Sequence, residues 1–359
     1  MNITFLIGNG FDVGIGMKSR FKDFFPIYQE NSCKKEERIR KFSDVIGSDY
    51  DTWADFECAL GQYTLKFNNE TKQDFIAQVK DFENDFIEYL KHNEMTLVFD
   101  DEVGDLMVNA LVQFYDSKNL APESSAAIRK VYSTHGAENH TYNFINFNYT
   151  FTLEKCLKTI SDDVVRTRRS GNVEKVDKIG QVVHVHGNCE LYPIIGVNDK
   201  SQIANKELAE DGMFCRYIVK PLLNQFLRQG NDANTTNIIN QSTIICVYGM
   251  ALGETDKKWW NLLIKWLNGN SERQLVVYEY DNKYTTSTQF GWLEKEDLII
   301  NKLAQYSGVG NDIEKLRSRI HIAIHKNIFS MRLSMRSDEE MDQLYNEIIM
   351  DQMMNDVLG

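Results

Sequence analysis

The chain lacks several features that mark common classes of protein. It has only four prolines in 359 residues, so no proline-rich linker divides it. Its six cysteines are scattered without a CxxC pair, which excludes the usual zinc-site spacings and gives no sign of a disulfide framework. No uninterrupted apolar run reaches the roughly 20 residues that a membrane-spanning helix needs. We therefore expect a folded cytoplasmic protein with no signal peptide, membrane segment or bound metal.

Positive charge is also scarce. The 40 Lys and Arg residues are outnumbered by 52 Asp and Glu residues, and the formal net charge is −12. A nucleic-acid surface needs clustered cations, so nucleic acid is not an expected partner. Arg166, Arg168 and Arg169 form a local basic group, which we predict to be solvated in a loop.

What the chain does contain is an alternation of apolar strands and amphipathic helices. Strands that are apolar nearly throughout are typical of a parallel sheet covered on both faces. Alternating strands and helices indicate an α/β fold with a doubly wound parallel sheet. The predicted strands lie at 2–7, 142–147, 181–186, 242–248, 274–280 and 319–324, and helices between the later ones at 202–228, 254–268 and 288–305.

The segment between the first two strands is different. Residues 19–131 have helical periodicity almost throughout, with amphipathic stretches near 35–47, 54–66, 70–92 and 104–117. We interpret residues 31–131 as a helical insertion, which either covers a ligand site or adds core. The sheet domain then comprises residues 1–30 plus 132–330.

Residues 331–359 hold a C-terminal helix. Ser337 and Glu340 fit a capping box at its start. Its apolar stripe is expected to pack on the body of the protein or on another subunit, as in a homo-oligomer.

Glycines follow the first strand directly, at positions 8, 10, 14 and 16. Glycine has no Cβ, so the backbone can turn tightly and approach a ligand closely. A helix that starts there offers free N–H groups and the positive end of its dipole to a phosphate. The loop predicts a nucleotide site, although a generic turn stays open because one glycine-rich loop is a weak signal.

Polar residues follow two later strands. Asn146 and Asn148 lie on the same side of the chain at a strand end, where open α/β sheets bind ligands. The alternative interpretation is that the two asparagines cap the next helix. His184 and His186 also share a side, and a histidine at a strand end suits general-base chemistry, although a structural role stays open.

A second glycine turn, Tyr248–Asp256, follows the strand at 242–248. Its acidic residues, Glu254 and Asp256, either hold ribose hydroxyls or complement a helix dipole. A further cluster, Trp53–Glu57, carries acids on an apolar helix that could face the same cleft.

Taken together, five motifs resemble the AbiH family of bacteriophage abortive infection proteins. The resemblance runs from the first strand to about residue 325. AbiH-type proteins are in turn similar to sirtuin-like NAD-binding domains, so a sirtuin-like, Rossmann-type fold is implied. The motifs are Ile7–Asp12 (IGNGFD), Trp53–Glu57 (WADFE), Phe147–Thr150 (FNYT), His184–Gly187 (HVHG) and Tyr248–Asp256 (YGMALGETD).

The resemblance implies roles for particular residues. Backbone N–H groups around Gly8 to Gly10 would hold a pyrophosphate, and the strand ending at Tyr280 would lie near the adenine. His186 would be a general base, Asn148 would position water or ribose, and Asp12 would stabilise positive charge on the sugar, as in glycoside hydrolysis. The implied NAD-binding set is Gly8, Asn9, Gly10, Phe11, Gly16, Asn146, Gly249, Met250, Leu252, Glu254, Asp256 and Tyr280.

The chain also departs from true sirtuins. It lacks their zinc-binding cysteines and a recognisable acyl-lysine groove, so a zinc-dependent deacylase is not expected. Asp12 replaces the serine of the sirtuin glycine loop, and Thr150 replaces the aspartate of the T-x-N-x-D segment. Sirtuin-like domains in phage defence lack the zinc module as well and are typically NAD hydrolases.

Two hypotheses follow from the resemblance. The first is an abortive infection effector that hydrolyses NAD at the nicotinamide–ribose bond. The second is a non-catalytic module that senses NAD or ADP-ribose. It is motivated by Thr150, which stands where sirtuins have the aspartate of the T-x-N-x-D segment. A constitutive NAD hydrolase would poison its host, so we expect a restrained resting state and a phage-derived trigger. A nucleic-acid effector is a weaker third reading, disfavoured by the acidic charge balance.

Overall fold

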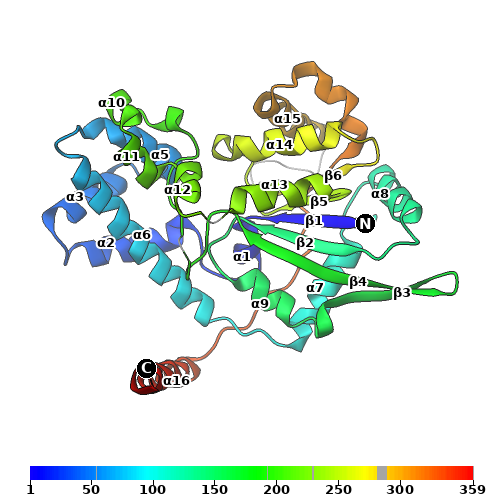
Figure 1. The fold of residues 1–359 in the computed structure, drawn as a ribbon, viewed down its shortest axis with the longest axis horizontal. Coiled ribbons are helices and arrows are strands. Elements are labelled where there is room, and N and C mark those ends of the chain that lie inside the picture. The colour runs from blue at the N-terminus through cyan, green and yellow to red at the C-terminus, as the bar shows by residue number, and fades with distance from the viewer. Residues whose placement is uncertain (54, 192, 229, 281–288, 359) are drawn as a thin grey trace.

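A seven-stranded sheet forms the centre of the protein, in the order β3-β4-β2-β1-β5-β6-β7 (Figure 1). The computed structural model describes residues 1–53, 55–191, 193–228, 230–280 and 289–358, without the side chains of residues 254, 289, 311 and 351–358. All neighbouring strands are parallel except β3 and β4, which form an antiparallel hairpin. The strands are β1 (Asn2–Ile7), β2 (Thr141–Asn146), β3 (Val164–Ser170), β4 (Val173–His184), β5 (Ile244–Tyr248), β6 (Gln274–Glu279) and β7 (Ile320–Ile324).

Hydrophobic packing on both faces explains why the central strands are apolar. Successive side chains of a strand point to opposite faces. Phe5 and Ile7 of β1 accordingly belong to one buried cluster, and Leu6 between them belongs to the other. The α/β class and the mostly parallel sheet predicted from the sequence are therefore confirmed.

Helices cover the two faces of the sheet. Three helices contribute buried residues to the cluster that contains Leu6. The cluster that contains Phe5 includes buried residues of four others and of a second group of helices. The first three are α13 (Asn231–Gln241), α14 (Lys257–Asn268) and α15 (Gln289–Ser307), and the four are α1 (Gly10–Gly14), α7 (Asp101–Gln113), α8 (Pro122–Thr134) and α9 (Thr152–Lys158).

A second group of helices packs beside the carboxyl edge of the sheet, and we call it the helical lobe (Figure 1). Its core is aromatic, with the rings of Phe56 and Phe82 stacked at 4.3 Å between centroids. The lobe comprises α2 (Phe21–Ser32), α3 (Glu37–Ser48), α4 (Tyr50–Trp53), α5 (Phe56–Tyr63), α6 (Lys72–Met95), α10 (Lys206–Glu210), α11 (Gly212–Ile218) and α12 (Lys220–Phe226).

The predicted continuous helix at 202–228 is wrong. The chain breaks at Asp211, whose carboxylate accepts hydrogen bonds from the N–H groups of Met213 and Phe214 and so starts a new helix. It breaks again before Pro221, which starts a helix readily but cannot continue one. The resulting short helices pack on the lobe, where Phe214 contacts Phe75 at 5.3 Å between ring centroids.

The β3–β4 hairpin corrects two further predictions. Residues 181–186 were predicted as a separate strand, but the strand is β4, which begins at Val173 and ends at His184. Arg166 and Arg168 were expected in a solvated loop, but they lie in β3 and bind the buried carboxylate of Asp177. Polar and charged residues occupy both faces of this edge hairpin, so it shows no apolar strand pattern.

The C-terminal helix α16 (Asp338–Leu358) begins as predicted. The Ser337 N–H donates to Glu340 Oε2 at 2.7 Å, and the Glu340 N–H donates to Ser337 Oγ at 3.3 Å, which is a capping box. The helix meets α6 where Tyr345 and His92 are hydrogen-bonded at 2.7 Å. Within the described part of the chain, none of the helices combines the length and apolar character needed to span a membrane.

Candidate functional site

The neighbouring strands β1 and β5 form the switch point of the sheet. The chain leaves β1 toward the β2 side and leaves β5 toward the β6 side. Open α/β sheets bind ligands in the crevice that such a divergence opens at the carboxyl ends of the strands. The glycine turns after β1 and β5 both lie at this crevice.

The two glycine turns cross in direct contact. The Gly8 N–H donates to Tyr248 O at 2.9 Å, and the Gly10 N–H donates to Gly249 O at 2.8 Å. A Cβ on Gly10 would lie 2.5 Å from the Cα of Gly249, and Gly249 itself has a φ of +71°. These glycines are therefore needed for the contact between the turns. The Gly8 and Gly10 N–H groups are already bonded within the protein, which corrects the expectation that they hold a pyrophosphate.

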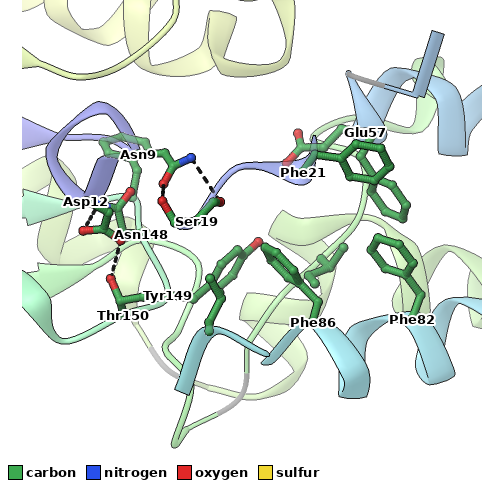
Figure 2. Close-up of a pocket in the computed structure, with 14 residues that line it drawn as sticks. Asn9, Asp12, Ser19, Phe21, Glu57, Phe82, Phe86, Asn148, Tyr149 and Thr150 are labelled. Atoms are coloured by element: carbon green, nitrogen blue, oxygen red, sulfur yellow. Dashed lines mark hydrogen bonds between the residues drawn. The ribbon is translucent and has the colours of Figure 1, made fainter. Parts of the chain in front are cut away.

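A cavity of about 300 Å³ lies on one side of the crossing, and we call it the first cavity. Polar side chains from the β1 and β2 ends lie at one end, and aromatic side chains of the lobe lie at the other (Figure 2). The cavity thus lies between the sheet and the lobe. Its lining residues are Asn9, Asp12, Ser19, Phe21, Phe56, Glu57, Phe82, Phe86, Leu90, Phe147, Asn148, Tyr149, Thr150 and Ile195.

Asp12 is the central group at the polar end. Its carboxylate accepts hydrogen bonds from Thr150 Oγ1 at 2.6 Å, Thr152 Oγ1 at 2.5 Å and Asn148 Nδ2 at 3.2 Å. Burial raises the pKa of Asp12 to about 6, although the two threonine hydroxyls act in the opposite direction. Asp12 is therefore mostly ionised at neutral pH and titrates close to it.

Asn148 is held in place by its neighbours. Its Nδ2 also donates to Gly8 O at 3.2 Å, and its N–H donates to Asn146 Oδ1 at 3.0 Å. His184 bonds the carbonyl of Asn148 at 2.8 Å and the carboxylate of Glu154 at 2.6 Å. Burial alone would lower the pKa of His184, but the Glu154 carboxylate more than offsets it and the pKa is raised. Asn146 and His184 thus position Asn148 from behind.

His186 does not line the first cavity. Its ring lies edge-on to Phe147, which does line that cavity, at 5.8 Å between centroids. Its Nδ1 is buried without a hydrogen-bond partner among the described residues, and burial lowers its pKa well below the usual value. His186 instead lines a separate pocket of about 10 Å³ with Lys220, Asn224 and other residues. The structure therefore does not bring His186 together with Asp12 and Asn148.

Glu57 does face the first cavity, as the Trp53–Glu57 cluster suggested. Its carboxylate accepts hydrogen bonds from the buried ammonium of Lys220 and from Asn198 Nδ2. Asp256 lies close enough that its burial and the negative charge of Glu57 raise the Asp256 pKa to about 7. Lys220 and Asn198 could not be linked to Glu57 by any local sequence signal, because they lie more than 100 residues away in the chain.

A second cavity, of about 790 Å³, lies on the other side of the crossing at the carboxyl ends of β5 and β6. Five of the predicted ligand-binding residues line it, namely Gly10, Gly249, Met250, Leu252 and Tyr280. Sequence reasoning missed its cations, which come from distant segments and share no motif. These are Arg20, Lys295, Lys302 and Lys326.

Of the other predicted binding residues, Asn9 lines the first cavity, and Gly8, Phe11, Gly16, Asn146 and Asp256 line neither cavity. The Phe11 side chain is buried in the core against Phe329, at 5.2 Å between ring centroids. Gly16 has a φ of +107° and lies against Arg332. Asn146 is fully buried behind Asn148, and the side chain of Glu254 lies outside the described residues. Among the described residues, no cluster of His, Cys, Asp and Glu is arranged to hold a metal ion.

The fold and the two cavities define an α/β protein with a candidate ligand site at the carboxyl edge of a mostly parallel sheet. The family model described as "Bacteriophage abortive infection AbiH" matches residues 4–278, and the chain belongs to this family. Its biological setting is thus abortive infection, a defence against bacteriophage. A search of curated proteins found no match.

Proposed function

We propose that this protein binds NAD across the two cavities and hydrolyses the bond between nicotinamide and ribose. The observation that carries the proposal is Asp12, a buried carboxylate that lines the first cavity and is fixed by three hydrogen-bond donors. The nicotinamide riboside half would occupy the first cavity, and the adenosine half would occupy the second.

The cations of the second cavity support this placement. Arg20, Lys302 and Lys326 line that cavity together with the ion pair of Lys295 and Glu279. Ammonium and guanidinium groups bind phosphate oxygens strongly. These cations would hold the pyrophosphate, in place of the glycine N–H groups that bond the opposite turn.

Breaking the nicotinamide–ribose bond needs no acid. The electron pair of the C1′–N bond passes to the cationic ring, so nicotinamide leaves as a neutral molecule. The ribose carries positive charge in the transition state, and an ionised Asp12 would stabilise it. Water then adds to C1′, and its proton passes to Asp12 and on to solvent, giving ADP-ribose. Asn148 would orient the ribose hydroxyls or the attacking water.

The test is release of nicotinamide from NAD by the purified protein, with phage lysate added as a source of trigger. We expect Asp12→Asn to lower the rate by about 10² to 10⁴-fold, the usual range for loss of a general base. Asp105→Asn, which removes an exposed carboxylate of α7, is the matched control. The wild-type rate should rise with pH through about 6, because Asp12 must be ionised. No release by wild type, or an unchanged rate in Asp12→Asn, would contradict hydrolysis.

The activity of a His186 variant is a second test of the proposal. His186→Asn should retain most of the activity, because Phe147 separates the imidazole from the first cavity. A loss as large as that of Asp12→Asn would restore the expectation that His186 is the general base.

One observation favours a second candidate, a non-catalytic sensor of NAD or ADP-ribose. Thr150 and Thr152 both donate to Asp12, so hydrogen bonds within the protein already engage the carboxylate that hydrolysis would use. NAD binding without release of nicotinamide, with Asp12→Asn weakening the binding, would support the sensor.

A further inference from the structure

The two cavities that flank the glycine crossing differ sharply in charge. The first cavity has two titratable carboxylates in its lining, Asp12 and Glu57, and no lysine or arginine among the described residues that line it. The second cavity holds Arg20, Lys302 and Lys326 beside its internal ion pair. The two linings therefore favour a ligand that is anionic at one end and neutral or cationic at the other.

Aromatic rings surround the end of the first cavity that holds Glu57. Phe21, Phe56 and Phe86 are each half-buried, so part of every ring still faces open space. Phe82 backs this group, stacked on Phe56 at 4.3 Å and on Phe21 at 6.3 Å between centroids. In Figure 2, Glu57 and Phe82 lie on one side of the cavity and Asp12 lies on the other. Aromatic faces beside a carboxylate attract flat cations, through the ring quadrupole and through direct charge.

Glu57 is held in a fixed position rather than solvated. Lys220, which is only 3% exposed, and Asn198 both donate to its carboxylate. Asp256, beside Glu57, has a pKa raised to about 7, first by burial and then by the charge of Glu57, while the Lys220 ammonium acts in the opposite direction. A cationic ligand beside Glu57 would reduce the repulsion between these two carboxylates, and an anionic one would add to it.

We propose that this end of the first cavity recognises an N-alkylpyridinium cation, and that it selects the oxidised nicotinamide ring over the reduced one. The inference rests on the proposed function for its full ligand, because the pyridinium would be the nicotinamide of NAD. The oxidised ring is planar and carries a positive charge, whereas the reduced dihydropyridine ring is neutral. Glu57 and the surrounding phenylalanines respond to that difference in charge, while the second cavity binds the part that the two forms share.

The test measures binding, using calorimetry for nucleotides and NMR titration for the ring alone. The probes are oxidised NAD, reduced NAD, ADP-ribose, 1-methylnicotinamide as the isolated cation and nicotinamide as its neutral counterpart. Asp12→Asn protein is used with every probe, so that turnover of oxidised NAD does not interfere and all affinities refer to the same protein. We expect oxidised NAD to bind at least tenfold more tightly than reduced NAD, and 1-methylnicotinamide to bind more tightly than nicotinamide.

Two variants test whether Glu57 and Phe86 cause the preference for the cationic ring. Glu57→Gln and Phe86→Leu should each reduce the preference for the cation to threefold or less and leave the affinity for ADP-ribose unchanged. Glu88→Gln, an exposed carboxylate on the same helix as Phe86, is the matched control and should change neither. A thermal melt of each variant excludes general loss of folding.

The outcomes separate this inference from the proposed function. Equal binding of oxidised and reduced NAD, or a preference that persists in Glu57→Gln, would overturn the inference while NAD binding stood. If no nucleotide binds but 1-methylnicotinamide still binds more tightly than nicotinamide in a Glu57-dependent way, the pyridinium site stands and the proposed function fails. If neither a nucleotide nor 1-methylnicotinamide binds, both are overturned.

Discussion

At the scale of single residues, the contact between the two glycine turns allows the sharpest test of the site. A Cβ on Gly249 would lie 2.7 Å from Phe11 N, and the backbone there has a φ of +71°. We expect Gly249→Ala to lower the free energy of unfolding by roughly 3 kcal/mol, because it combines left-handed strain with a backbone clash.

Gly253→Ala is the control for this prediction. It lies in the same turn, but its Cβ would meet only atoms of Thr255, of which Oγ1 is the nearest at an ordinary 3.4 Å. Chemical denaturation of both variants measures the difference directly. If the two variants were equally stable, close approach of the turns would not be the reason for a glycine at position 249.

Part of this site is readable from single residues in the sequence. A glycine-rich loop after an apolar strand, and polar residues after the next strand, predicted that Asp12 and Asn148 lie near a cavity, and both line the first cavity. His186 could not be placed in this way. Its ring packs against Phe147, and Phe147 in turn packs against Trp259, which belongs to a helix more than 70 residues later.

At the scale of elements, the β3–β4 hairpin depends on a buried charge cluster. Asp177 accepts from Arg166, Arg168 and the N–H of His140, and its side chain is fully buried. We expect Asp177→Ala to cost about 3 kcal/mol of stability, because it leaves two partly buried arginines without their acceptor. Glu174→Ala, at an exposed position of β4, should cost almost nothing.

The same cluster predicts a pH dependence of stability, because the pKa of Asp177 is shifted in the opposite direction to the pKa of Asp12. Burial would raise the pKa of Asp177, but hydrogen bonds from His140, Arg168 and Arg166 dominate and hold it well below its usual range. A lowered pKa stabilises the folded state above pH 4 and loses that stabilisation as the pH falls further. The amide protection factors of the hairpin, which compare the observed exchange rate with the intrinsic rate at the same pH, should therefore fall below about pH 4 in wild type. Asp177→Ala should lack this response. Protection factors that are independent of pH in wild type would contradict the assignment.

The elements that the sequence did not reveal share a physical cause. Most of the apolar strands were located within two residues, because burial on both faces leaves a continuous apolar run. The β3–β4 hairpin has no such run, since it lies at the sheet edge and its buried charges are neutralised by partners across the strands. The short helices between 206 and 226 look like one helix from their periodicity, and only the Asp211 cap and Pro221 divide them.

At the scale of the whole molecule, the first cavity has walls from both the sheet and the lobe. A ligand that fills it should therefore stabilise the contact between these two parts. We expect NAD at about 100 times its dissociation constant to add about 2.7 kcal/mol to the free energy of unfolding. Amides of α5 and α6 should exchange more slowly in the same complex.

Asp12→Asn protein allows this measurement without turnover, with ADP-ribose as the comparison ligand. ADP-ribose lacks the ring, so it should slow exchange around Gly249 to Gly253 and leave α5 and α6 nearly unchanged. Equal protection of the lobe by both ligands would show that the ring does not reach the lobe.

The crossing of the glycine turns also makes the two cavities thermodynamically dependent on each other. Asn9 faces one cavity and Gly10 faces the other, and the Gly10 N–H holds the turn after β5. A ligand that shifts either turn must also shift the other turn. A ligand in one cavity therefore changes the affinity of the other cavity for its ligand. The factor is the same whichever cavity is filled first. Fragments of a dinucleotide should then bind with cooperativity even when nothing joins them.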